Sequence, residues 1–254
     1  MKVLLILADG MRPDSFTNVP AAQKILAKSA YNLKTQSVMP TVTLPCHMSL
    51  FYSVPPERHG TMDNVFTPWV RPMDGLCEVL NKNGRTCAMF YDWGALRDVA
   101  RYNTTTHTYF VSSKKMGRER SCNMVTAAAL DFLTNEHTDF TFLYYGIPDC
   151  MGHDHGWMGE EYMQSVVFCW EHIQRVVETL GDEYTVIITA DHGGHARTHG
   201  TQMPEDMNIP LIIMGKDIPA GEAFPGATIL DIAPTVAKLL GVDPDPEWEG
   251  KSLL

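Results

Sequence analysis

The chain has 254 residues, of which 44% are hydrophobic, and it carries a formal net charge of −10 at pH 7. This length and apolar content suffice for one sizeable core, so we expect a single domain over residues 1–254. The acidic balance argues against a nucleic-acid-binding surface or a polybasic membrane patch, and no apolar run approaches the roughly 18 residues of a membrane span.

Strand and helix patterns alternate along the chain. In chain order they predict a strand over 2–8, a helix over 20–31, a short helix over 44–54, a helix over 76–83, a strand over 86–91, a helix over 119–135, a strand over 140–145, a helix over 158–180, strands over 184–190 and 209–214, and a helix over 231–240. This alternation predicts an α/β fold, an open and mostly parallel central sheet with helices on both faces. The turn-rich segments 55–75 and 193–207 are predicted to line a site rather than to separate domains.

The first strand resembles a short export signal, but Asp9 interrupts it early and no small-residue cleavage site follows. We therefore interpret residues 2–8 as a buried strand. The six cysteines are scattered without a CxxC pair, which favours reduced thiols and a cytoplasmic location over disulfides. They are Cys46, Cys77, Cys87, Cys122, Cys150 and Cys169.

Aspartate and histidine residues come soon after the ends of three of the predicted strands. They are Asp9, Asp149, His153, Asp191 and His192. Open parallel sheets bind ligands at the carboxyl ends of their strands, and carboxylate with imidazole is a common donor set for a divalent cation. Taken singly, each cluster has a simpler interpretation as a cap, a surface turn or an incidental pair. Their joint occurrence at successive strand ends favours a metal centre.

Two metal sites with three protein ligands each need a sixth Asp or His ligand. His199, seven residues after His192, is the candidate, and His195 is its rival. The remaining histidines, including His47, are interpreted as structural or surface residues.

Thr43, at the start of the short helix over 44–54, is the candidate nucleophile. A bound divalent cation lowers the pKa of such a hydroxyl, and a helix N-terminus favours the anion. A plain helix cap is the simpler interpretation, and Thr41 is the competing hydroxyl. Cys46 lies nearby in sequence, but no histidine is placed as its base. Two metals with a hydroxyl nucleophile are typical of phosphoryl transfer.

These residues resemble the alkaline phosphatase superfamily, and within it the type I phosphodiesterase / nucleotide pyrophosphatase family. The resemblance covers nearly the whole chain. It rests on Ala8-Asp9-Gly10 with Arg12-Pro13, Pro40 to His47, Pro55 to Gly60, Asp63-Asn64, Tyr144 to His153, Asp191-His192-Gly193 and Trp248 to Leu253. It implies an alkaline-phosphatase-like core with a minimal cap.

The resemblance also implies roles for the candidates. One cation is held by Asp9, Thr43, Asp191 and His192, and the other by Asp149, His153 and His199. Thr43 forms a phospho-threonine intermediate, Asn64 holds a phosphoryl oxygen, and Tyr144 and Leu44 border a nucleoside. The implied cofactors are two divalent cations, zinc first and manganese as the alternative.

Two departures from the family pattern indicate a more open site that is less committed to nucleotides. Phe and then Pro-Asn usually follow the nucleophile, where this chain has Leu44-Pro45-Cys46. The segment from His192 to His199 is short, where nucleotide pyrophosphatases carry a long insertion.

The expected function is hydrolysis of a small-molecule phosphodiester. The alternatives are a phosphomonoesterase that uses Arg12 or Arg197 as an extra cation, a phosphonoacetate-type hydrolase, and a non-catalytic metal-binding protein. A sulfatase is disfavoured because no Cys-x-Pro-x-Arg is present. A phosphomutase is disfavoured because core-like elements occupy the segment between Thr43 and Asp149, which leaves no room for an inserted cap domain.

Overall fold

A mixed sheet forms the centre of the molecule in the computed structural model, which describes residues 1–68 and 73–254. Within these residues the strands lie in the order β4-β3-β5-β1-β6-β7-β2-β8. Their bounds are β1 Lys2–Ala8, β2 Ala30–Gln36, β3 Cys87–Tyr91, β4 His107–Phe110, β5 Phe140–Tyr145, β6 Tyr184–Thr189, β7 Asn208–Met214 and β8 Gly221–Glu222. Neighbouring strands from β4 to β6 pair parallel, whereas β7 pairs antiparallel with both β6 and β2. The predicted α/β class is confirmed.

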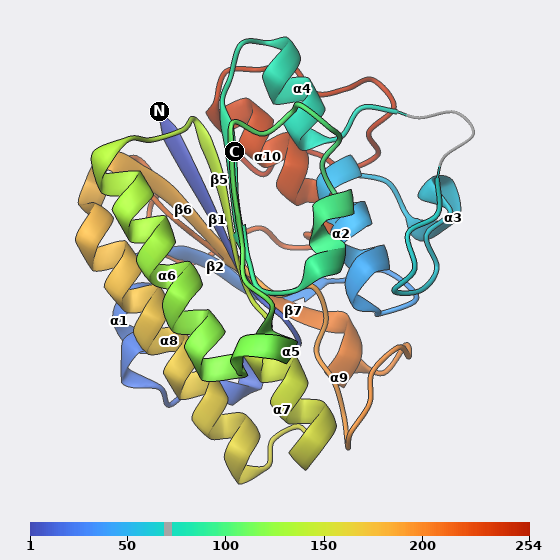
Figure 1. Ribbon diagram of the computed structural model, residues 1–254, viewed down its shortest axis with the longest axis vertical. Coiled ribbons are helices and arrows are strands. Elements are labelled where there is room, and N and C mark those ends of the chain that lie inside the picture. The colour runs from blue at the N-terminus through green and yellow to red at the C-terminus, as the bar shows by residue number, and fades with distance from the viewer. Residues whose placement is uncertain (69–72) are drawn as a thin grey trace.

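Helices cover both faces of this sheet (Figure 1). The α-helices are α1 Pro20–Leu26, α2 Thr43–Tyr52, α3 Pro56–His59, α4 Leu76–Lys82, α5 Ser113–Met116, α6 Arg118–Asn135, α7 Ile147–His155, α8 Glu160–Leu180, α9 Pro204–Met207 and α10 Ile232–Leu239. Short 3₁₀ turns lie at Pro13–Ser15, Gly94–Asp98, Gly181–Glu183 and Ile229–Asp231. Helices α1, α6 and α8 lie on one face and α2, α4 and α10 on the other, while α5, α7 and α9 lie at the lower end in Figure 1. None of the helices in the described residues is long and apolar enough to cross a bilayer.

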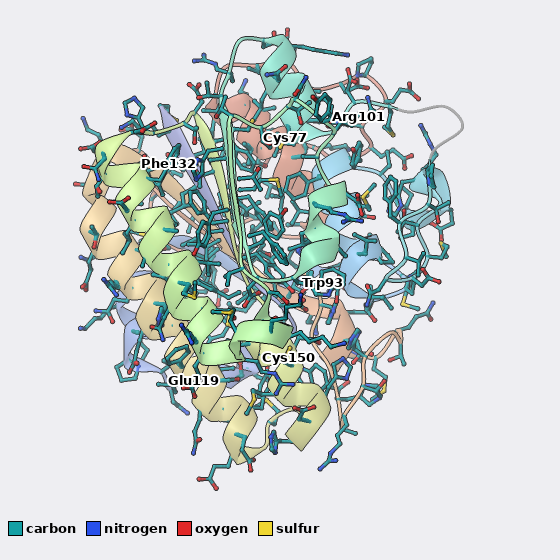
Figure 2. The ribbon with its side chains drawn as sticks, in the orientation of Figure 1. Cys77, Trp93, Arg101, Glu119, Phe132 and Cys150 are labelled. Atoms are coloured by element: carbon teal, nitrogen blue, oxygen red, sulfur yellow. The ribbon has the colours of Figure 1, made fainter. Side chains whose placement is uncertain are left out.

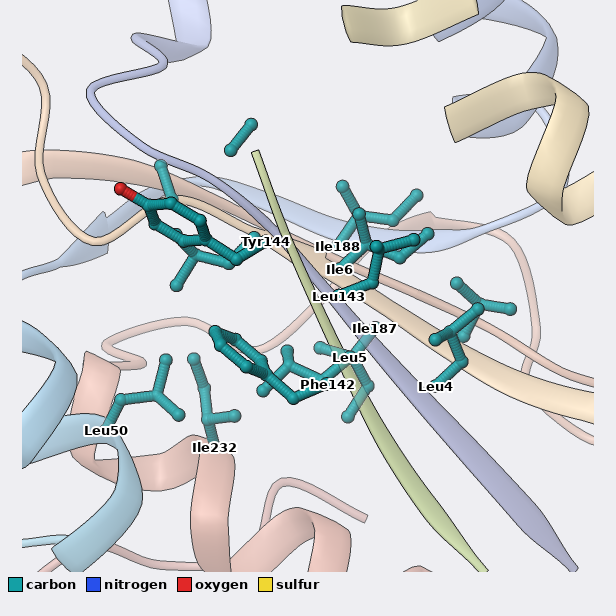
Figure 3. Close-up of a cluster of buried hydrophobic side chains, with 14 of the residues drawn as sticks. Leu4, Leu5, Ile6, Leu50, Phe142, Leu143, Tyr144, Ile187, Ile188 and Ile232 are labelled. Atoms are coloured by element: carbon teal, nitrogen blue, oxygen red, sulfur yellow. The ribbon is translucent and has the colours of Figure 1, made fainter. Parts of the chain in front are cut away.

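The central strands are buried on both faces, as their continuous apolar runs require. Side chains of β5 alternate between the two layers. Phe142 packs edge-on against Phe51 of α2, and Figure 3 shows Phe142 and Tyr144 on the same side as Leu50 and Ile232.

The predicted helix over 20–31 is wrong in its second half. Helix α1 ends at Leu26, and Ala30 instead begins β2, where it pairs with Ile213. The Ser29 hydroxyl donates to the Ile25 carbonyl at 2.7 Å, and the Lys28 amide donates to the same carbonyl at 3.0 Å, so the chain turns away from the helix axis at this point. Strand β2 escaped prediction because its polar residues break the apolar pattern.

Further elements were not predicted, and besides α7 and β4 they are the short helices α3, α5 and α9 and the edge strand β8. The region between β5 and α8 contains a separate helix, α7, and β4 adds an edge strand that was not predicted. The predicted site-lining segment 55–75 is described only in part, because residues 69–72 lie outside the described residues.

His59, at the end of α3, makes the stability of the fold depend on pH. Its Nδ1 accepts from the Thr61 amide at 3.1 Å, and its Nε2 lies 3.0 Å from Ser49 Oγ. Burial lowers the pKa of His59 to about 4, against an ordinary value of about 6.5 in the unfolded chain. Between these values the unfolded state binds more protons, so stability falls as pH falls through this window.

We therefore expect His59→Gln to flatten the pH dependence of the free energy of unfolding between about pH 6.5 and pH 4. The wild type should lose up to about 3 kcal/mol more than the variant across this window, because only the wild type must charge a buried imidazole. Urea denaturation of both proteins at a series of pH values measures the difference. Parallel curves for the two proteins would show that folding does not lower the pKa of His59.

Candidate metal centre

The ends of three adjacent strands bring the predicted ligands together. The register pairs Ala8 of β1 with Tyr145 of β5, and Leu7 with Thr189 of β6. The three strands therefore end at one level. Asp9 continues the pairing, since its amide donates to the Tyr145 carbonyl at 2.9 Å.

The first ligand group comes from the ends of β1 and β6 and the start of α2. His192 Nε2 lies 3.4 Å from Asp9 Oδ1, 3.4 Å from Asp191 Oδ2 and 3.2 Å from Thr43 Oγ1. Zinc–ligand bonds of about 2.0–2.1 Å place two ligand atoms of a tetrahedral site about 3.3 Å apart. The three distances from His192 Nε2 are close to that value, so these side chains form a candidate ligand group.

The second ligand group comes from α7 and from the loop after β6. Asp149 and His153 are one helical turn apart on α7, with Asp149 Oδ1 3.5 Å from His153 Nε2. His199 Nε2 lies 3.5 Å from the same carboxylate oxygen and 3.0 Å from His153 Nε2. Asp149 also lies within 4.8 Å of ligand atoms of Asp9 and His192, so it lies between the two groups.

The tautomers of the three histidines favour a cation over hydrogen bonds among them. Each Nδ1 faces a backbone carbonyl: Gly193 at 2.8 Å for His192, Arg197 at 3.1 Å for His153, and Thr41 at 2.7 Å for His199. A neutral imidazole that donates from Nδ1 presents a bare lone pair at Nε2. Two such lone pairs, on His153 and His199, meet at 3.0 Å. With both Nδ1 atoms donating to those carbonyls, the two Nε2 atoms face one another as lone pairs, and a shared cation is a partner that fits.

Unsatisfied carboxylate oxygens point to the same conclusion. Asp9 Oδ1, Asp149 Oδ1 and Asp191 Oδ2 are buried and have no hydrogen-bond partner within the described residues. Such groups are costly in a folded protein unless an ion or water satisfies them. They are the same oxygens that face the imidazoles.

The buried carboxylates of the site also lack a compensating positive charge. Burial, followed by repulsion from Asp191 and Asp149, raises the pKa of Asp9 well above its ordinary value. Burial likewise raises the pKa of Asp191, lowers that of His192, and lowers that of His199 to about 4. His192 and His199 are therefore neutral at pH 7 and do not compensate the carboxylates. Divalent cations supply that compensation.

Thr43 opens α2, whose N-cap is Val42 and makes no side-chain cap bond. The simpler interpretation of Thr43 as the cap residue is therefore excluded. Asn64 lies beside it, because its Oδ1 accepts from the Leu44 amide at 2.9 Å. The structure thus brings Asn64, the Thr43 hydroxyl and the first ligand group to one place.

The rivals of the predicted residues have other partners. His195 Nδ1 contacts Asp206 Oδ1 at 2.7 Å, away from both ligand groups, so His199 is the histidine brought to the centre. The Thr41 hydroxyl donates to the Thr201 carbonyl and accepts from the Gly200 amide. Cys46 is fully buried, and burial raises the pKa of its thiol.

Leu44 and Tyr144 differ from their expected role as walls of a nucleoside pocket. Leu44 is 0% exposed and Tyr144 is 2% exposed, so neither presents a face to a ligand in this structure. The Tyr144 hydroxyl instead donates to Asp9 Oδ2. Tyr144 follows the inward alternation of β5. Leu44 packs into the core.

His47 belongs to the centre, and its interpretation as a structural or surface residue missed this. It is fully buried, its Nδ1 lies 2.8 Å from the Thr43 carbonyl, and the same atom lies 3.6 Å from Asp191 Oδ2. It links α2 to Asp191, one of the candidate ligands. Its spacing of four from Thr43, on one face of a helix, was the available signal.

Comparisons with known proteins agree with this geometry. Residues 3–203 match the type I phosphodiesterase / nucleotide pyrophosphatase family. A 2,3-bisphosphoglycerate-independent phosphoglycerate mutase of Clostridioides difficile is 29% identical over 57% of this chain, and the bis(5'-adenosyl)-triphosphatase enpp4 of Xenopus laevis is 27% identical over 76% of it. The matched region spans 29% of the mutase and 47% of the triphosphatase.

Solved structures show the same fold over the whole chain. Murine ectonucleotide pyrophosphatase / phosphodiesterase 5 superposes with a TM-score of 0.80 at 15% identity and covers 100% of both chains. An inactive threonine-to-alanine form of that protein has been solved in complex with AMP, and it superposes with a TM-score of 0.79 at 14% identity over 98% of both chains. With a family match over most of its length and a fold that agrees, the chain belongs to the type I phosphodiesterase / nucleotide pyrophosphatase family of the alkaline phosphatase superfamily.

Proposed function

We propose that the protein hydrolyses small-molecule phosphodiesters with Thr43 as nucleophile, on two divalent cations held by the two ligand groups. The observation that carries this proposal is the set of Nε2 lone pairs that converge with unsatisfied carboxylate oxygens. Thr43 Oγ1 lies at the edge of this set, 3.2 Å from His192 Nε2. Asp and His donors suit Zn²⁺, with Mn²⁺ as the alternative.

The proposed reaction is a two-step displacement at phosphorus. When bound, the cations stabilise charge on the attacking and leaving oxygens and lower the pKa of the Thr43 hydroxyl. Thr43 Oγ1 forms a bond to phosphorus as the bond to the leaving alcohol breaks. Water then attacks phosphorus, the bond to Thr43 breaks, and the phosphomonoester leaves. The Thr43 proton passes to solvent, because His192 Nε2 is assigned as a ligand, and the leaving oxygen takes up a proton from solvent. In the second step one proton of the attacking water returns to Thr43 Oγ1.

Asn64 and the start of α2 stabilise the charge that develops on phosphorus. Asn64 uses Oδ1 to accept from the Leu44 amide, so its NH₂ group is the part that donates to a phosphoryl oxygen. The Thr43 amide lies in the first helical turn, where the helix offers it no carbonyl acceptor. Both donors are held by backbone before substrate binds, which is the condition for preorganised stabilisation.

The hydrogen bonds of Arg12 favour a diester over a monoester substrate. A monoester carries an additional negative charge, for which Arg12 was a candidate partner. Arg12 donates from Nε and Nη2 to Asp14 and from Nη1 to the Gly194 carbonyl. Its guanidinium is therefore already committed to protein acceptors.

The test compares kcat/KM for bis-p-nitrophenyl phosphate and p-nitrophenyl phosphate after reconstitution with Zn²⁺ or Mn²⁺. We expect the diester to be preferred by at least about tenfold. A preference for the monoester would make the protein a phosphatase and return attention to Arg197. No turnover of either ester with two cations bound would overturn the proposed reaction.

The relatives suggest which diesters to test next. The AMP complex and the triphosphatase relative point to substrates that contain adenosine phosphates. The buried positions of Leu44 and Tyr144 argue against a stacked nucleoside at that wall. Dinucleoside polyphosphates and simple alkyl diesters, compared as kcat/KM, separate the two possibilities.

A further inference from the structure

Asp92 is a fourth aspartate at a strand end, but it is not in either ligand group. It follows β3 directly and is 2% exposed. Its Oδ1 accepts from the Gly146 amide at 3.2 Å, its Oδ2 accepts from Ser121 Oγ at 2.9 Å, and its backbone carbonyl accepts from the Ser113 amide at 3.0 Å. One side chain therefore joins the end of β3 to α6 and to the turn between β5 and α7.

That turn sets the direction of the helix that carries two metal ligands. Gly146 is the only residue between the end of β5 at Tyr145 and the start of α7 at Ile147. Asp149 follows three residues later and His153 seven residues later. A Cβ at Gly146 would lie 3.1 Å from Asp92 Oδ1 and 3.2 Å from the Tyr144 ring, so the turn is packed tightly against Asp92. A change in the Gly146 backbone would move α7 as a unit.

The other end of α7 is held by the first turn of α6. Ser121 Oγ also lies 2.8 Å from the Arg118 carbonyl, and Arg118 Nη1 contacts Asp154 Oδ2 at 2.6 Å and Met151 Sδ at 3.4 Å. Asp154 is the neighbour of His153. Figure 2 shows this end of the molecule, with Glu119 in the first turn of α6 and Cys150 on α7.

We propose that Asp92 is a positioning residue for the second cation: through Gly146 and Ser121 it fixes α7, so that Asp149 and His153 meet His199. This inference rests on the proposed two-metal site. Metal affinity depends on such outer contacts because ligands that are already oriented lose less freedom on binding.

Burying the Asp92 carboxylate costs free energy, so we infer that its hydrogen bonds to Ser121 and Gly146 have a functional role. Burial raises the pKa of Asp92 to about 6, although Ser121 and the Gly146 amide favour its charged form. A role in fold stability alone is the competing interpretation. The two roles differ in which property each variant changes.

Asp92→Leu has a similar size but removes both hydrogen bonds. We expect it to weaken one of the two Zn²⁺ sites by at least about tenfold and to leave the other unchanged. Asp92→Asn should restore affinity, because its Oδ1 accepts from Gly146 while its Nδ2 donates to Ser121 Oγ, whose own proton then goes to the Arg118 carbonyl. Titration of the metal-free proteins with Zn²⁺ against a chromophoric chelator measures both sites.

Thr138→Val is the matched control at the opposite end of β5. Thr138 is buried, and its hydroxyl lies 3.0 Å from the Phe140 carbonyl and 2.8 Å from Thr141 Oγ1. We expect it to lower the melting temperature without changing either metal affinity.

If Asp92→Leu does not fold, Ser121→Ala removes only the link to α6 and should weaken the same site by about threefold or more.

The outcomes separate this inference from the proposed function. Unchanged affinities in Asp92→Leu, equal weakening of both sites, or failure of Asp92→Asn to restore affinity would each overturn the positioning role. A wild-type protein that binds fewer than two cations would instead overturn the two-metal site itself.

Discussion

Thr43→Ala is expected to lower kcat for diester hydrolysis by at least about 10⁴-fold, because it removes the atom that attacks phosphorus. The fold should survive the change. Thr43 makes no cap bond, and alanine is the best helix former for the start of α2. Metal content should also remain near two ions per chain, because Asp9, Asp191 and His192 still supply three ligands to the first cation. Steady-state kinetics with bis-p-nitrophenyl phosphate, together with elemental analysis of the purified protein, measures both quantities.

Thr43→Ser is the matched control, since it keeps a hydroxyl at the same position. It should retain activity within about 10²-fold of the wild type, because the serine hydroxyl reaches phosphorus with more rotational freedom. Rapid acid quenching should trap phosphate on Thr43 in the wild type and on the serine in this variant, and on neither residue in Thr43→Ala. If Thr43→Ala keeps normal turnover, Thr43 is not the nucleophile.

His199→Ala is expected to remove one of the two cations and to lower kcat/KM by about 10³-fold. His199 Nε2 faces His153 Nε2 at 3.0 Å and Asp149 Oδ1 at 3.5 Å, so its loss leaves the second cation with two protein ligands. Catalytic zinc sites usually keep three. The first cation should remain, because none of its ligands is changed.

His195→Ala is the control for the same loop. Its imidazole contacts Asp206 Oδ1 rather than either ligand group, so both cations should stay bound. Loss of this hydrogen bond to a charged group should lower stability by about 1.5–3 kcal/mol. The metal-to-protein ratio and a urea titration of each variant measure these effects. If His195→Ala loses a cation and His199→Ala keeps both, the assignment of the two histidines is reversed.

Much of the sheet could be predicted because its central strands carry local patterns. Residues 2–8, 140–145 and 184–190 are continuous apolar runs of strand length, and each became a central parallel strand. The strands β2, β4 and β8 were missed because they lie toward the edges of the sheet. Their polar residues follow no clear period, and their conformation depends on pairing with β7, β3 and β2.

The identity of most ligands was also available from local patterns. An Asp directly after a buried parallel strand must lie at the carboxyl edge of the sheet, whatever the rest of the chain does. This argument predicts that Asp9 and Asp191 lie at one edge, whereas Asp149 lies four residues beyond the end of β5, in α7. It could not separate them from Asp92, which also follows a strand but binds Gly146 and Ser121.

Contacts between residues distant in sequence decided the rest. The choice of His199 over His195 depends on the Thr41 carbonyl, 158 residues away, which orients the His199 ring, and on Asp206, which holds His195. The burial of Leu44 and Tyr144 and the inclusion of His47 depend on how α2 packs against β5 and Asp191. Residue type and spacing limit which groups can bind a metal, whereas side-chain direction and burial follow from packing partners that lie elsewhere in the chain.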